Sequence, residues 1–195
     1  NIQINSKEYN CQRTMKISTL FIIIVFSSKV FSASDSISIL FYNVENLFDT
    51  EDDTLKNDDE FLPDSKKKWT NTKWNEKTNK IAKIIAGNNY PEIIGLCEIE
   101  NKLVLEKLKN HYLFKNKKYS IIHFESPDSR GIDCALLYQH NKLDILSMRA
   151  NKVNLNGRKT RDILSATFTH LNDTLALFVN HWPSRYGGKK KSNPK

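Results

Sequence analysis

The chain has 195 residues, of which 39% are hydrophobic, so it is long enough for one domain with a buried core. Its formal net charge of +8 is unevenly distributed: five basic residues and no acid lie in 185–195, and the segment 35–184 is net neutral. Overall basicity is therefore no argument for nucleic-acid binding, and only the lysines at 189–191 weakly favour a polyanion.

The N-terminal segment has the pattern of an export signal. Met15 and Lys16 precede an apolar run at 17–26, and small residues follow up to Ser34. The run is shorter than the roughly 20 residues that span a membrane, which argues against the alternative of an uncleaved anchor. We expect 1–14 to be upstream translated sequence and 15–34 to be a signal peptide. The product is then periplasmic or extracellular, without membrane attachment after cleavage.

The first apolar run after this signal, at 38–42, predicts a buried strand that ends at Asn43. An acidic stretch follows from Asp49 to Asp64, and the lysines at 66–68 close it. Such a stretch is usually a solvated loop. A calcium-binding loop is the alternative, although the glycine and the regular spacing of an EF-hand are missing.

Two helices and six further strands are predicted after the acidic stretch. One face of the first helix is formed by residues three or four positions apart: Trp74, Thr78, Ile81 and Ile85. Gly87 ends this helix, and Asn101 begins the second as its N-cap, with an end near Asn110. The predicted strands cover 93–98, 119–124, 134–138, 143–149, 163–169 and 174–181. This order indicates a layered α/β fold.

Three of the predicted strands lead into polar residues, namely Asn43, Glu98 and the pair Asn180 and His181. A carboxylate after the apolar run at 93–97 is costly unless a cation or hydrogen bonds compensate it. Mg²⁺ is held by one or two carboxylates together with water and phosphate oxygens. The alternative for Glu98 is a cap of the following helix, a role for which Glu100 is the better candidate.

The segment 180–185 combines groups that suit phosphate chemistry. His181 can donate a proton near neutral pH, Ser184 can bind a phosphate oxygen, and Arg185 is a planar phosphate binder. A structural turn at Pro183 is the alternative. Asn43 can likewise hold a phosphate oxygen or a metal ligand in place, or simply form a turn.

Two other features have a structural and a functional interpretation. Arg130 and Asp133 flank the start of an apolar strand, where they form a structural ion pair or face a substrate. Cys97 and Cys134 lie inside apolar runs and are expected to be small hydrophobic residues. A disulfide between them is the alternative in an exported protein.

Four segments, in this order, resemble the endonuclease/exonuclease/phosphatase family of DNase I-like phosphodiesterases: 41–49, 95–101, 129–138 and 179–185. The resemblance implies a four-layer α/β/β/α sandwich that hydrolyses a phosphate ester with Mg²⁺ or Mn²⁺, most simply as an endonuclease acting on nucleic acid. It implies metal-site roles for Glu98, Asn43 and Glu45, catalytic roles for His181, Asn43 and Asn180, and substrate contacts for Arg130, Asp133, Ser184 and Arg185.

The sequence departs from the family's pattern after these segments. Motifs of the Gly-Asp-Phe-Asn and Ser-Asp-His type are missing, and no acid or histidine follows Arg185. We therefore expect 35–195 to be an incomplete domain that folds poorly and has little activity alone. The alternative is a secreted, non-catalytic module that binds phosphate or nucleic acid. Neither interpretation implies a stable protein partner.

Overall fold

The computed structural model describes residues 36–154 and 159–182. The chain divides into two units, Asn1–Asp35 and Ser36–Lys195, and every described residue belongs to the second. The predicted signal peptide at 15–34 and the segment before it lie outside the described residues. Among the residues that are described, no helix combines the length and the apolar character needed to cross a membrane.

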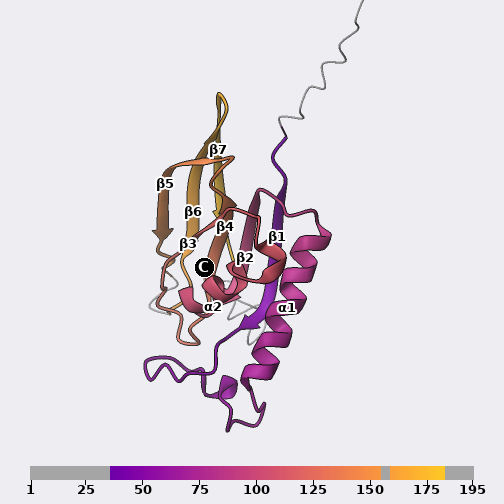
Figure 1. The fold of residues 1–195 in the computed structure, drawn as a ribbon. Helices are drawn as coiled ribbons and strands as arrows, with labels where there is room; N and C mark the ends of the chain where they lie inside the picture. Colours follow the sequence, from indigo (N-terminus) through magenta and orange to yellow (C-terminus); the bar gives the residue numbers. More distant parts are fainter. Residues whose placement is uncertain (1–35, 155–158, 183–195) are drawn as a thin grey trace, which may run out of the picture. The chain divides into compact units, whose positions relative to one another are not determined.

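Seven strands form two sheets (Figure 1). Sheet A has the order β1-β2-β4-β3, from β1 (Ile39–Leu47), β2 (Ile93–Ile99), β4 (Asp133–Gln139) and β3 (Tyr119–His123). In sheet A, β1 and β2 are parallel and the other neighbours are antiparallel. Sheet B is an antiparallel meander of β5 (Asp144–Asn151), β6 (Ile163–His170) and β7 (Asp173–Val179).

The two predicted helices are confirmed as α1 (Asn71–Gly87) and α2 (Lys102–Lys109). In α1 the predicted face is buried, so the 3.6-residue period identified the side that packs on the sheet. In α2 the Asn101 side chain accepts a hydrogen bond from the Val104 amide at 3.1 Å, as an N-cap should. Two 3-10 turns, η1 (Asp59–Phe61) and η2 (Tyr112–Phe114), complete the described helical structure.

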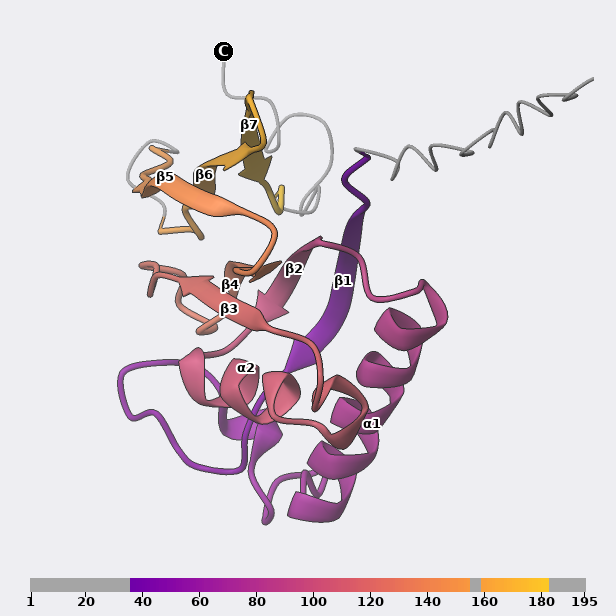
Figure 2. The same ribbon diagram turned by 45° about the horizontal axis from the view of Figure 1, so that its top comes forward.

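Two hydrophobic cores separate three layers. The first core packs both helices on one face of sheet A, and the second packs sheet B on its other face (Figure 2). Strand β2 contributes to both cores because successive side chains point to opposite faces: Ile94 and Leu96 face the helices, whereas Ile93 and Cys97 face sheet B. The chain therefore has three layers of the α/β/β/α sandwich, and no described helix covers the outer face of sheet B.

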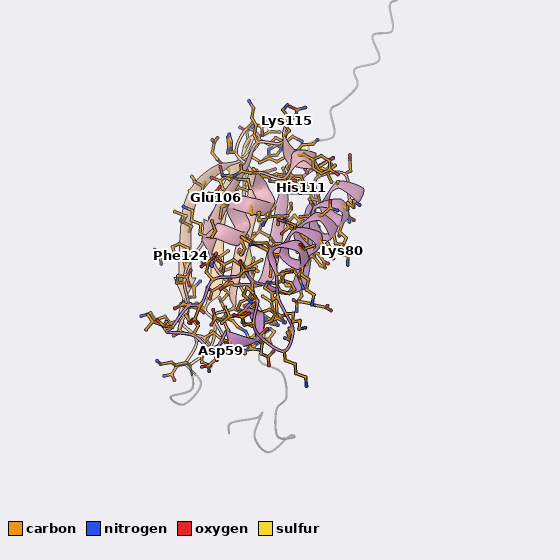
Figure 3. All side chains as sticks on the ribbon, turned by 60° about the horizontal axis from the view of Figure 1, so that its bottom comes forward. Asp59, Lys80, Glu106, His111, Lys115 and Phe124 are labelled. Carbon is orange, nitrogen blue, oxygen red and sulfur yellow. The ribbon has the colours of Figure 1, made fainter. Side chains whose placement is uncertain are left out.

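The acidic stretch is only partly a solvated loop. Asp59 is exposed. In Figure 3 it lies at one end of the view, opposite Lys115, which follows η2. Asp49 and Asp58 are instead buried. The Asp58 carboxylate accepts the Asp53 amide at 3.0 Å, and Glu100 accepts the Asp49 amide at 2.6 Å. The first bond holds the acidic stretch together, and the second ties its start to Glu100, directly after β2 of sheet A.

Candidate active site

Asn43, Glu98 and His181 meet at one carboxylate oxygen. The Asn43 side-chain amide donates a hydrogen bond to Glu98 Oε1 at 3.1 Å, and His181 Nε2 lies 3.3 Å from the same oxygen. The three residues come from β1, β2 and the segment after β7, and they are 55 and 83 positions apart in the chain.

The strands do not end at Asn43 and Glu98, as the apolar runs predicted, but continue to Leu47 and Ile99 through irregularities. Cys97 pairs with Cys134 and Ile99 with Asp133, which leaves Glu98 as an extra, unpaired residue on β2. On β1, Asn43 pairs with Cys97 and Leu47 with Ile99. A β-bulge of this kind changes the direction in which a side chain points. Here Glu98 is left as the one residue of β2 that is not buried.

The backbone at these irregularities is strained. Glu98 has φ of 63°, and Glu45 and Asn46 on β1 have φ of 56° and 66°. Residues with a side chain rarely adopt this left-handed region, and such residues cluster where a fold must present a group for binding. Glu45 is exposed, and its amide donates to Asn43 Oδ1 at 2.9 Å. Asn43 is therefore held on both sides, by Glu45 and by Glu98.

A buried ion pair, which the sequence did not single out, holds His181 in place. Arg161 donates from Nε to the His181 carbonyl at 2.6 Å and lies 3.2 Å from the Asp128 carboxylate. Both charged side chains are only 5% exposed. Asp128 also accepts the Arg130 amide at 3.0 Å. In the sequence, Arg161 is one of several basic residues at 158–161. Such a cluster before a strand is equally typical of a solvent-exposed loop, so it does not predict a buried ion pair.

The electrostatic environment keeps His181 neutral. Burial lowers the pKa of His181, Arg161 lowers it further, and Glu98 acts in the opposite direction. An ionised carboxylate only accepts hydrogen bonds, so the neutral ring places its hydrogen on Nε2, toward Glu98. Lys77 reaches this region from α1, donates to the Glu45 carbonyl, and has its pKa lowered by burial. The positive charges of Lys77 and Arg161 near Glu98 and His181 favour the presence of an anion.

The other predicted site residues occupy different positions. The Asn180 side chain donates to the Phe178 carbonyl at 3.4 Å rather than to Glu98. The Arg130 side chain is 53% exposed, and its Nε lies 3.4 Å from Asp128 Oδ1 rather than pairing with Asp133. Asp133 is 1% exposed and accepts the Ser126 amide, which does not fit the expected contact with substrate because a carboxylate so buried cannot reach a phosphate ester. Ser184 and Arg185 lie outside the described residues.

The described residues fit a divalent cation at Glu98. Its side chain is 15% exposed, so one face of the carboxylate remains open. Asn43 uses both ends of its amide, toward Glu45 and Glu98, and therefore orients the carboxylate rather than offering a free oxygen. One carboxylate with water and phosphate oxygens is an ordinary arrangement for Mg²⁺.

Cys97 and Cys134 lie beside this site as a directly opposed pair. Their sulfur atoms are 3.7 Å apart, and both are buried free thiols in the structure. The hydrogen bond with the neighbouring Cys134 thiol and, after it, burial raise the pKa of Cys97, so it is not a reactive thiolate. The interpretation of both residues as small hydrophobic side chains fits these positions.

Comparison with known proteins gives a family match and a fold match. The model of the endonuclease/exonuclease/phosphatase family matches residues 38–195. The catalytic domain of human nocturnin, solved with a bound sulfate anion, is 17% identical with a TM-score of 0.50, over 77% of this chain and 51% of that chain. A mannosyl-6-phosphatase of Bacteroides thetaiotaomicron is 15% identical with a TM-score of 0.48, over 73% and 50%.

These comparisons show the fold of the described unit. The chain spans about half the length of the solved structures that it matches. No curated protein sequence is significantly similar to it. The nocturnin match supports the arrangement of the two sheets, on which Asn43, Glu98 and His181 come together.

Proposed function

Because this chain belongs to the endonuclease/exonuclease/phosphatase family, we propose that it forms part of a phosphoesterase site in which Glu98 holds a divalent cation. The activities in the family's name all break a phosphate ester. The observation that carries the proposal is that Asn43 and His181 approach the same oxygen of Glu98 from distant parts of the chain.

The proposed cation is Mg²⁺ or Mn²⁺, which would neutralise phosphate charge and acidify a bound water. Asn43 keeps the Glu98 carboxylate in one orientation through its bond at 3.1 Å. His181 lies beside the Glu98 carboxylate at 3.3 Å, where a bound phosphate could compete for its Nε2 hydrogen, and Arg161 fixes the position of its backbone. Arg130, more than half exposed, provides a cation for the incoming anion.

We take the substrate to be a phosphodiester of nucleic acid, cleaved by an endonuclease. Support comes from two basic groups near the site: Lys77 is close enough to act on Glu98, and Arg130, more than half exposed, acts on His181. A polyanion gains more from such a set than a single phosphate does, because adjacent phosphates each find a cation. Binding of a short single-stranded oligonucleotide should therefore be tighter than binding of a sugar phosphate, and should weaken as salt is added.

Metal and anion binding test the proposal directly. Mn²⁺ titration, with and without an oligonucleotide, should show binding that Glu98→Gln weakens at least tenfold, since the ion loses its charged ligand. Glu76→Gln, on the exposed face of α1, is the matched control and should change nothing. Equal Mn²⁺ affinity in the Glu98→Gln and unaltered chains would remove Glu98 from the metal role.

Hydrolysis by the 195-residue chain should be very slow. The described site contains one carboxylate, and the sequence has no acid or histidine after Arg185 to help activate water. Catalytic groups act as a unit, so the loss of one costs orders of magnitude in rate. Robust metal-dependent phosphodiesterase activity from this chain would contradict the proposal. In a longer form that supplies the missing motifs, Glu98→Gln should abolish hydrolysis.

Export is also part of the proposal and rests on the sequence pattern at 15–34. N-terminal sequencing of the protein recovered from outside the cytoplasm should find a start near Ser32 to Ser34. A product that retains residues 17–31 would instead indicate a membrane anchor.

A further inference from the structure

A second group of metal-binding side chains lies where β3 turns toward β4. His123 ends β3 and is paired with Ala135, so its side chain shares a sheet face with that of Ala135 and with Asp133 two positions earlier. Glu125 follows His123 by two positions. One nitrogen or oxygen from each of His123, Glu125 and Asp133 lies within 4.8 Å of the others.

Two of these atoms are buried without a hydrogen bond. The side chains of His123 and Asp133 are 3% and 1% exposed. His123 Nε2 and Asp133 Oδ2 have no hydrogen-bond partner among the described residues, although they lie 3.3 Å apart. Asp133 uses its other oxygen to accept the Ser126 amide at 3.1 Å. A buried polar atom that lacks a hydrogen bond is costly, so something else should satisfy this pair.

The distance between the two atoms suits a shared metal ion. In a tetrahedral zinc site with bonds of about 2.0 to 2.1 Å, neighbouring ligand atoms are roughly 3.4 Å apart. The separation of 3.3 Å between Nε2 and Oδ2 is close to that value. A direct bond between an imidazolium and a carboxylate is shorter, at about 2.7–2.9 Å. The geometry is therefore nearer to two ligands of one ion than to a buried ion pair.

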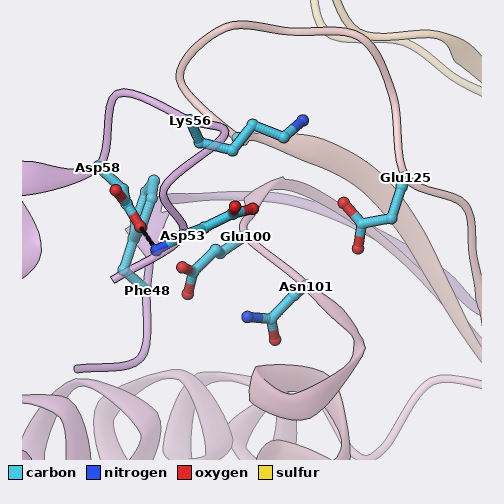
Figure 4. A pocket seen from close by; sticks show the side chains of 8 residues that line it. Phe48, Asp53, Lys56, Asp58, Glu100, Asn101 and Glu125 are labelled. Carbon is cyan, nitrogen blue, oxygen red and sulfur yellow. Dashed lines mark hydrogen bonds between the residues drawn. The ribbon is translucent and has the colours of Figure 1, made fainter. Parts of the chain in front are cut away.

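Glu125 supplies the third ligand from the solvent side. Its side chain is 58% exposed, and its Oε1 lies 3.9 Å from His123 Nδ1, whereas Asp133 faces the other ring nitrogen, Nε2. It faces a cavity of about 80 Å³ that is also lined by Asp53, Asp58 and Glu100 (Figure 4). Burial and the neighbouring Asp133 raise the pKa of Glu125, which shows that negative charge is crowded here. Glu125 is thus the member of the cluster that borders this cavity.

Positive charge within the protein offsets this crowding only in part. His123 and Lys56 act to lower the pKa of Glu125, against burial and Asp133, which raise it. Lys56 also donates its ammonium hydrogens to the carbonyls of Ser126 and Asp128 at 2.9 and 3.2 Å. One ring nitrogen of His123 and one oxygen of each carboxylate still lie close enough together to share a cation.

We propose that His123, Glu125 and Asp133 bind a divalent transition-metal ion, represented by Zn²⁺, at a site separate from Glu98. A ring nitrogen with two carboxylates favours Zn²⁺ over Mg²⁺, which prefers oxygen ligands. Three protein ligands leave the fourth position for water. Bound there, the ion would join β3 to β4 and fix residues 124–132, the segment that carries Asp128 and Arg130. This site goes beyond the proposed function and does not depend on it.

Zinc titration in the Glu98→Gln background tests this site without interference from the proposed catalytic cation. Calorimetry should show one equivalent of bound Zn²⁺, and Zn²⁺ should raise the thermal midpoint of unfolding. Glu125→Gln should weaken binding by more than the roughly tenfold that loss of an outer-shell partner costs. Because Glu125 is largely exposed, this variant should fold normally. Glu51→Gln, an exposed acid outside the cluster, is the matched control.

A second variant and a second probe give independent outcomes. Asp133→Asn keeps the oxygen that accepts the Ser126 amide, and it should lose Zn²⁺ binding while its circular dichroism spectrum remains native. Nitrogen NMR of the His123 ring should show Nε2 without a proton once Zn²⁺ is bound. Unchanged Zn²⁺ affinity in Glu125→Gln, or a ring that stays protonated on both nitrogens at saturating Zn²⁺, would establish a buried ion pair and overturn the proposal.

Discussion

The two sheets differ in how they are covered. Sheet A has helices on one face and sheet B on the other, and all residues of β2 except Glu98 are buried. Among the described residues, sheet B is covered on one face only, and Phe178 on its other face is 64% exposed. The central strands β2 and β4 of sheet A bury nearly all their side chains, whereas its edge strand β1 leaves Ile39 and Phe41 50 and 57% exposed. The stability of the described unit should therefore reside mainly in sheet A and in its contacts with sheet B.

The largest expected effect is at the buried ion pair that joins the two sheets. Arg161 precedes β6 of sheet B, and Asp128 lies in the connection from β3 to β4 of sheet A. Arg161→Met should cost about 3–5 kcal/mol of unfolding free energy, because it leaves the Asp128 carboxylate buried without its cation. Urea unfolding measures this cost. Adding Asp128→Asn should recover part of it, and a loss under about 1 kcal/mol would show that the pair does not join the sheets.

Two leucine-to-alanine substitutions compare how much each sheet contributes to the unfolding free energy. Leu96 in β2 is fully buried in the core under the helices, whereas Leu146 in β5 is 59% exposed. Leu96→Ala should cost about 3 kcal/mol through lost burial and the cavity it leaves. Leu146→Ala should cost less than about 0.5 kcal/mol. Equal losses in chemical denaturation would mean that the outer face of sheet B is covered in solution.

Low pH should weaken the contacts that Glu92, before β2, makes with residues before β1 and β5. Glu92, before β2, accepts hydrogen bonds from Ser38, and Lys142, before β5, donates to it at 2.5 Å. These partners outweigh burial and lower the pKa of Glu92 to about 2. A lowered folded pKa stabilises the protein above the unfolded value of 4.5, and that contribution disappears as the pH falls from 4.5 toward 2.

The expected size is about 1 kcal/mol, because Lys142 is nearly half exposed and water screens the pair. Unfolding free energies measured between pH 6 and pH 2.5 should show this loss, and Glu92→Gln should remove that part of the pH dependence. If the variant keeps the full pH dependence, other acids account for it.

The smallest effect on stability should come from the exposed face of β7. Phe178→Ser should change the unfolding free energy by less than about 0.5 kcal/mol, since the ring is 64% exposed. It should, however, slow aggregation, because exposed apolar surface on a sheet promotes association. Light scattering during incubation, with the buried Val179→Ser as a destabilised comparison, separates solubility from stability. Faster aggregation of Phe178→Ser would contradict the assignment of this face as open.

The secondary structure followed closely from local patterns in the sequence. The face of α1 was visible because helical burial repeats every three or four residues, and Asn101 was visible because an N-cap requires a side chain that can accept an amide. The strand ends at Asn43 and Glu98 were placed wrongly. Apolar runs report burial, and a bulge interrupts burial without ending the strand.

The sequence by itself singled out the residues of the proposed phosphoesterase site, because Asn43, Glu98 and His181 each follow a short apolar strand. Only the tertiary structure decided that they meet at one oxygen, that Arg161 and Asp128 hold His181, and that Asp133 belongs to a buried cluster with His123 instead of facing substrate. The physical reason is that side-chain type and periodicity are local properties. Sheet order, bulges and contacts between buried charges depend on segments that are far apart in the chain.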